Sequence, residues 1–193
     1  MFKLGVNLEG KIIIIVAASG TGKSTLIKKI KKEFVELLES ISYTTREKRV
    51  GEVDGTHYFF TNEKEFMWKK DHDEFIEWAE VHKNYYATSK EFVEFNIQNG
   101  KSLLFDLDVQ GTDSFKKYFG DKAKAIFIAP PSLNELEKRL RERATESPAA
   151  IEVRINNAKN EILRKNDYDY CVINEDLNQA YLELRAIVKE ILG

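Results

Sequence analysis

The chain has 193 residues, of which 42% are hydrophobic, and this suits one substantial core with inserted subdomains rather than two independent domains. Its 30 basic and 32 acidic residues give a formal net charge of -2, which excludes a global field that favours a nucleic-acid polymer or an anionic membrane surface. The single cysteine, Cys171, excludes an intramolecular disulfide and a multi-cysteine metal site. With no secretory signal or bilayer-spanning apolar stretch in the sequence, we expect a cytoplasmic protein.

The first predicted element is a buried strand over the apolar run Ile12 to Val16, and a phosphate loop follows it. Small residues let backbone N–H groups turn inward around a polyphosphate, and the next helix adds the positive end of its dipole. Ala17 stands where the strict motif has its first glycine. An alanine disrupts the loop at this position only if the backbone there requires a positive φ. Lys23 supplies a charge for the β- and γ-phosphates and Ser24 a Mg²⁺ ligand. The residues expected to bind a nucleoside triphosphate here are Ala18, Ser19, Gly20, Thr21, Gly22, Lys23, Ser24 and Thr25.

A strand-to-helix turn with an incidental lysine is the alternative interpretation of this segment. It is disfavoured by the apolar residues that follow at helical spacing: Leu26, Ile27, Ile30, Phe34, Leu37 and Leu38.

Further short apolar runs predict buried strands at 103–107, 125–129 and 170–173, with helix-spaced segments between several of them. This alternation indicates an α/β fold with a central parallel sheet flanked by helices. Asp106 ends one of these runs at the carboxyl edge of the sheet, where it is a natural partner for Mg²⁺, directly or through water, although a plain strand-end aspartate has the same pattern.

Two predicted helices lie in the C-terminal half. Ser132-Leu-Asn-Glu135 is a capping box that predicts a helix start, with Leu133, Leu136 and Leu140 on its apolar face. An amphipathic pattern from Leu177 to Leu192 predicts the helix that closes the fold.

The segment from Ser40 to Phe60 resembles the GMP-binding segment of guanylate kinases, whose pattern is approximately S-x-S-x-T-T-R-x-P-R-x-G-E-x-D-G-x-x-Y-x-F. Other matches follow in the family's order: Phe75-Ile-Glu-Trp-Ala79, Tyr85-Tyr86, Asp106-Leu-Asp-Val-Gln-Gly111, Ala129-Pro-Pro-Ser132, Arg139-Leu-Arg-Glu-Arg143 and Val172-Ile-Asn-Glu-Asp176. The resemblance implies a P-loop NTPase core at 1–38, 98–130 and 155–193, a GMP-binding insert at 39–97 and a helical lid at 131–154.

The resemblance also implies a monophosphate site at Arg46, Arg49, Tyr58 and Tyr86. A phosphate dianion suits two guanidinium forks backed by phenol groups in a compact space. Without the surrounding motif, two surface arginines in a polar loop would be an equally good interpretation.

Guanine selection is expected from Glu77, because one carboxylate can accept both the N1–H and the exocyclic amino group of guanine. Adenine has a lone pair at N1 and would face the carboxylate acceptor to acceptor. By resemblance, the hydroxyls of Ser42 and Thr88 donate to O6, and Asp108 lies near the base and ribose. Glu77 taken alone would be interpreted as a solvated glutamate on a strand.

Arg139, Arg143 and Arg154 resemble the lid and core arginines around the transferring phosphoryl group, where charge is spread over the equatorial oxygens. Out of context, Arg139 and Arg143 would be a solvated basic helix face. Asn174 is implied at the ATP site. No general base is required, because the attacking phosphate oxygen is already ionised near neutral pH.

The chain departs from the family pattern at Ala17, Lys48, Ala87 and Ala144, and none of these changes removes a ligand group. The expected activity is therefore ATP:GMP phosphotransfer, with ATP and GMP or dGMP as substrates and Mg²⁺ as cofactor, in a monomer or homodimer. The alternatives are a guanylate kinase-like protein-interaction module and a related P-loop kinase with another acceptor. Intact Lys23 and Ser24 disfavour the first, and Glu77 with Ser42 disfavours the second.

Overall fold

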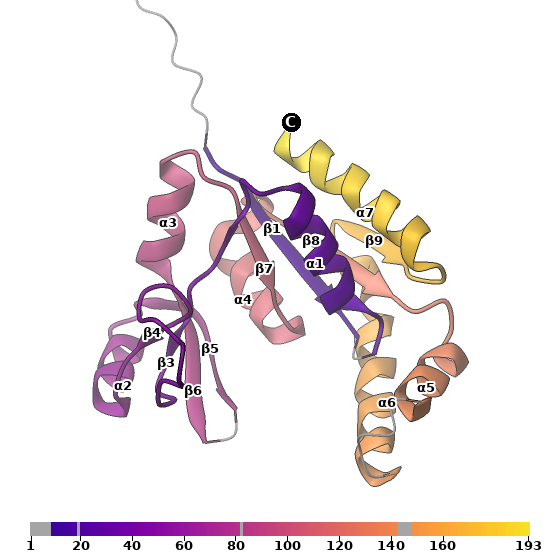
Figure 1. Cartoon of the computed structure of the whole chain (residues 1–193), viewed down its shortest axis with the longest axis horizontal. Helices are drawn as coiled ribbons and strands as arrows, with labels where there is room; N and C mark the ends of the chain where they lie inside the picture. Colours follow the sequence, from indigo (N-terminus) through magenta and orange to yellow (C-terminus); the bar gives the residue numbers. More distant parts are fainter. Residues whose placement is uncertain (1–8, 19, 82, 143–147) are drawn as a thin grey trace, which may run out of the picture.

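The central sheet is parallel and has five strands in the order β2-β7-β1-β8-β9 (Figure 1). The computed structural model describes residues 9–18, 20–81, 83–142 and 148–193. The strands of this sheet are β1 (Ile12–Ala17), β2 (Leu38–Glu39), β7 (Leu103–Asp106), β8 (Ala123–Ala129) and β9 (Tyr170–Ile173). The four predicted strands and the α/β fold class are therefore confirmed, and β2 is an additional edge strand.

Helices cover both faces of this sheet, which explains why β1 is a continuous apolar run. Ile13 and Ile15 face α1 (Lys23–Glu33) and α7 (Leu177–Leu192). Ile12 and Ile14 face α3 (Lys90–Gln98) and α4 (Val109–Phe119) on the opposite side. Val16, further along that face, packs in a cluster with α5 (Leu133–Glu142) and α6 (Pro148–Leu163).

The helix after the phosphate loop is shorter than predicted. It ends at Glu33, and Phe34 takes a non-helical C-cap conformation. Leu37 is buried in the following turn, while Leu38 pairs with Leu103 in the sheet. The spacing of apolar residues predicted too long a helix, because a buried residue outside a helix is as apolar as one within it.

The segment expected as the insert contains a second sheet of four strands in the order β4-β3-β6-β5. Its elements are β3 (Tyr43–Thr44), β4 (Phe59–Phe60), α2 (Glu63–Asp71), β5 (Phe75–Val81) and β6 (Asn84–Ser89). A separate small core of Phe66, Phe75 and Ala87 stabilises it. Figure 1 shows this sheet at the lower left and α5 with α6 at the lower right, on either side of the central strands.

The C-terminal helices begin as expected. The Glu135 N–H donates to Ser132 Oγ at 3.1 Å, which caps α5, while Leu136 and Leu140 are buried and Leu133 is exposed. The expected lid boundary at 154/155 falls inside the continuous helix α6. Two short 3-10 turns, η1 (Gly120–Lys122) and η2 (Lys165–Asp167), complete the elements. Within the described part of the chain, no helix has the length and apolar character to cross a membrane.

Candidate active site

The phosphate loop joins β1 to α1 and adopts a conformation that glycine permits. Gly20 and Gly22 have φ values of +91° and +87°. Ala17 is not among the described residues with positive φ, so the missing first glycine is tolerated. The loop lines a pocket of about 360 Å³, to which Lys23, Ser24, Thr25, Asp108 and Glu161 also contribute.

The loop is held from beneath by side chains. Thr21 Oγ1 donates to the Ala18 carbonyl at 2.9 Å, and Asn174 Nδ2 donates to the Thr21 carbonyl at 2.6 Å. Asn174 is only 4% exposed, and its own N–H donates to the Ala129 carbonyl at 2.8 Å. In this structure the Asn174 side-chain amide therefore hydrogen-bonds the phosphate loop and supports it, a role that the sequence did not predict.

Lys23 makes two contacts at the carboxyl end of β7. Its Nζ lies 2.5 Å from Asp106 Oδ1 and donates to the Leu107 carbonyl at 3.1 Å. From the sequence, phosphate is the predicted partner of Lys23 and Mg²⁺ the predicted partner of Asp106. The direct ion pair between them follows from the parallel sheet, which brings the ends of β1 and β7 to one edge.

A second pocket of about 330 Å³ lies between the insert and β7. All four residues expected near the base line it: Ser42, Glu77, Thr88 and Asp108. Asp106 lines it too, as do Glu39 and Ser40, which sequence reasoning had not assigned. Asp108 lines both this pocket and the phosphate-loop pocket, so the two sites are adjacent.

Glu77 is directed toward the pocket from β5, where the register shifts between Phe75 and Glu77. Thr88, its neighbour on β6, donates a hydrogen bond from Oγ1 to Glu77 Oε1 at 2.6 Å. Burial raises the pKa of Glu77, the Thr88 bond opposes that shift, and the charge of Asp108 adds to it. The Thr88 hydroxyl is thus engaged with Glu77 here, whereas the resemblance implied a bond to guanine.

The expected monophosphate residues gather around Arg46. Its Nη2 donates to Glu52 Oε1 and its Nη1 to the Glu47 carbonyl, both at 2.7 Å. The guanidinium carbon lies 5.4 Å from the Tyr58 ring centroid. Glu52, and then Tyr86, raise the pKa of Arg46.

Glu52 is a site residue that sequence reasoning missed. Its second oxygen accepts from the Arg49 backbone N–H at 2.7 Å. One carboxylate therefore contacts both arginines of the predicted monophosphate site. Arg46, and then the Arg49 N–H, lower the pKa of Glu52 to about 2. Its place in the turn Gly51-Glu-Val-Asp-Gly55, directly after the two arginines, was the available signal.

The expected lid arginines differ in placement. Arg139 donates to Glu135 Oε1 and the Asn174 carbonyl, both at 2.9 Å, so it reaches the segment before α7. Arg154 is half-buried on α6. Arg141 pairs with Glu137 on the surface. Ser19, Arg143 and Ala144 lie outside the described residues.

Two other departures from the family pattern fit the structure. Lys48 is exposed, and Ala87 is buried in the small core of the insert.

In the ranges that the structure describes, no group of three or more His, Cys, Asp or Glu side chains could hold a metal ion.

The family model described as guanylate kinase matches residues 9–191. The chain belongs to the guanylate kinase family. The guanylate kinase of Bartonella quintana is 46% identical over 179 residues, which cover 93% of this chain and 80% of that protein. That of Prochlorococcus marinus is 45% identical over 183 residues, which cover 95% of this chain and 98% of that protein.

A solved structure agrees with this assignment to the guanylate kinase family. The crystal structure of guanylate kinase from Anaplasma phagocytophilum has a TM-score of 0.66 and 30% sequence identity, and the match covers 96% of this chain and 88% of that one. Family membership confirms the resemblance first recognised in the segment from Ser40 to Phe60 and its companion motifs.

Proposed function

We propose that this guanylate kinase family member transfers the γ-phosphoryl group of ATP to GMP or dGMP, giving ADP and GDP. The observation that carries the proposal is the meeting of two pockets at Asp108. One pocket is lined by a phosphate loop with its lysine, and the other by a carboxylate and hydroxyls suited to guanine.

The donor nucleotide would bind at the phosphate loop. Its N–H groups and the N-terminus of α1 suit an anion, and Lys23 suits the charge that develops between the β- and γ-phosphates. To reach the phosphate, Lys23 exchanges its contact with Asp106 for one with ATP. Arg139, Arg143 and Arg154 would stabilise the charge on the transferring group.

The acceptor would bind in the second pocket with its phosphate at Arg46, Arg49, Tyr58 and Tyr86. Arg46 is already oriented by Glu52, which reduces the entropy lost on binding. Ionised Glu77 would accept both guanine donors. Adenine would present its N1 lone pair to that half-buried carboxylate in place of the guanine donors, and a site built for such bonds commonly rejects the wrong ligand by roughly 10⁴ or more.

Catalysis in this arrangement is alignment and charge stabilisation. The attacking GMP oxygen carries no proton to remove near neutral pH, so the chain's task is to hold that oxygen in line with the γ-phosphorus. We propose that α5 and the N-terminal part of α6, which together span the lid range 131–154, close over the nucleotides and exclude water as a competing acceptor.

Mg²⁺ fits the donor set at this site. The Ser24 hydroxyl and the Asp106 carboxylate are the hard oxygen ligands that Mg²⁺ prefers, and few protein ligands are needed because phosphate and water complete its shell. Ser24 would hold it directly and Asp106 through water. When bound, Mg²⁺ neutralises phosphate charge.

We also propose a cytoplasmic location for the protein, where a reducing environment would keep Cys171 as a free thiol.

The test measures ADP formation with MgATP across a panel of nucleoside monophosphates. We expect rapid ADP formation with GMP and dGMP and little with AMP, CMP or UMP. Lys23→Met should lower turnover more than about tenfold, or ~1.4 kcal/mol, because it keeps the stem and removes the charge. Lys28→Met, an exposed lysine on the same helix, is the matched control and should retain activity. An absence of GMP-dependent ADP formation by the wild-type chain would refute the proposal.

A further inference from the structure

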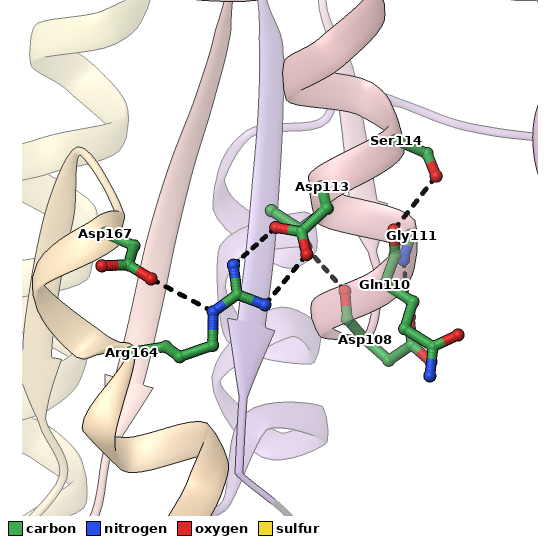
Figure 2. A network of polar contacts seen from close by, with 8 residues as sticks. Asp108, Gln110, Gly111, Asp113, Ser114, Arg164 and Asp167 are labelled. Carbon is green, nitrogen blue, oxygen red and sulfur yellow. Dashed lines mark hydrogen bonds and ion pairs between the residues drawn. The ribbon is translucent and has the colours of Figure 1, made fainter.

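One arginine ties the C-terminal end of α6 to α4 (Figure 2). Arg164 donates from Nη1 and Nη2 to the two oxygens of Asp113 at 2.9 and 2.7 Å. Its Nε donates to Asp167 Oδ2 at 3.1 Å. Arg164 directly follows α6, and Asp113 on α4 is 51 residues away in the sequence, so the guanidinium ties the end of one helix to a remote one with a parallel fork.

This contact is better suited to orientation than to stability. The Arg164 side chain is 36% exposed and that of Asp113 is 52% exposed. Ion pairs at such positions stabilise folded proteins little because water and salt screen them. A bidentate fork nevertheless restricts the relative rotation of the groups it joins.

On the α4 side, the fork holds the helix whose N-cap is Asp108. Asp108 Oδ1 accepts from the Gly111 N–H at 2.8 Å, and its carbonyl accepts from Thr112 Oγ1 at 2.7 Å. Thr112 is fully buried, so the first turn of α4 and Asp108 form one packed unit. This unit contributes Asp108 to both nucleotide pockets.

On the α6 side, the fork holds the helix that carries Arg154. Glu161 lines the phosphate-loop pocket, so one face of α6 points toward that pocket. Arg154 and Glu161 are seven residues apart, a spacing that places them on the same helix face. Because α6 is continuous from Pro148 to Leu163, the rotation of its C-terminal end sets the direction of this face.

We propose that Arg164 is a positioning residue for phosphoryl transfer, which fixes Arg154 on α6 relative to Asp108 on α4. This inference rests on the proposed function. Arg164 touches neither nucleotide in this scheme and acts through Arg154. A misplacement of about 1 Å in a reacting geometry can cost up to roughly 10²-fold in rate, so turnover is the quantity that should respond.

The first test is Arg164→Ala, assayed with MgATP and GMP. We expect kcat to fall about tenfold while the Michaelis constants for both nucleotides change less than about twofold. Arg164→Lys keeps the charge but not the fork, and should resemble the alanine variant. Arg141→Ala is the matched control: Arg141 also donates twice to a carboxylate, at 2.8 and 2.6 Å, but within α5 alone, and should keep full turnover.

A double-mutant cycle separates positioning from a general structural effect. If Arg164 acts through Arg154, adding Arg164→Ala to Arg154→Ala should lower kcat no further. Independent, additive losses would overturn the proposal, and so would an unchanged kcat in Arg164→Ala.

A second variant covers the case in which Arg164→Ala does not fold. Asp113→Ala, at an exposed helical position, removes the same fork from the other side and should give the same loss of kcat. An Asp113→Ala variant with full turnover would overturn the inference. An active wild type with unaffected variants refutes only this inference, whereas an inactive wild type refutes the proposed function.

Discussion

At the scale of single residues, two glutamates of the insert occupy opposite environments. Glu52 accepts from Arg46 and Arg49, and these bonds lower its pKa to about 2. The pKa of Glu77 is raised above its ordinary value of 4.5, chiefly by burial. Glu52 therefore stays ionised at any working pH as the counter-ion of Arg46, while Glu77 titrates at a higher pH.

This contrast predicts the pH dependence of GMP binding. Protonated Glu77 presents an O–H donor where guanine also has donors, so only the ionised form accepts both bonds. Because its pKa is raised, the Michaelis constant for GMP should increase as the pH falls toward and below that pKa, starting above pH 4.5. The Michaelis constant for ATP, measured over the same range, should lack this component.

The phosphate of GMP also titrates, at about pH 6, so a control is required. The variant Glu77→Gln lacks the titrating carboxyl group. Its pH profile therefore retains only the dependence that comes from the GMP phosphate. If the variant and the wild type show the same pH profile for GMP, Glu77 is not the group that responds.

At the scale of elements, the phosphate loop depends on a segment that is remote in sequence. β1 and α1 bring its ends together, but the Asn174 side chain, just before α7, supports its middle through the Thr21 carbonyl. A Cβ built on Gly22 would lie 2.6 Å from Asn174 Nδ2. Gly22 is therefore required both for its left-handed backbone and for this close approach.

We predict that Gly22→Ala raises the Michaelis constant for ATP at least about tenfold, because the loop must shift to relieve the contact and loses aligned N–H groups. The Michaelis constant for GMP should change much less. Gly120→Ala is the control, since Gly120 also has positive φ but nothing lies within 4 Å of its added Cβ. It should lose roughly 1–3 kcal/mol of stability and keep ATP binding. Equal effects of Gly22→Ala on both nucleotides would contradict this account of the loop.

At the scale of the whole molecule, the insert has its own small core and meets the central sheet at the acceptor pocket. Strands β5 and β6 supply Glu77 and Thr88, while the end of β7 supplies Asp106. A nucleotide in this pocket would contact both parts at once. Its binding should stabilise the folded chain as a unit.

The corresponding prediction is a thermal shift. GMP at about 100 times its dissociation constant should add ~2.7 kcal/mol of stability. For a chain of this length, that increment corresponds to a rise in Tm of roughly 5–10 °C. AMP at the same concentration should give little shift, and Arg46→Ala should reduce the GMP shift while keeping that of ATP. Equal shifts with GMP and AMP would show that the pocket does not discriminate between the bases.

The sequence by itself determined the features that depend on neighbouring residues. The glycines, Lys23 and the apolar run before them specify a phosphate loop, because the loop's geometry is local and only small residues allow it. The spacing of Arg46, Arg49 and the turn after them likewise indicated the acceptor segment. Strand positions followed from apolar runs whose length excludes most helices.

Only the tertiary structure decided which remote groups meet. It placed Asp108 in both pockets, paired Lys23 with Asp106, and joined Arg164 to Asp113. It also removed Leu37 and Leu38 from the predicted helix. Hydrophobic periodicity records that a residue is buried but not which element covers it. A charged side chain similarly finds its partner only when packing brings another element within a few ångströms.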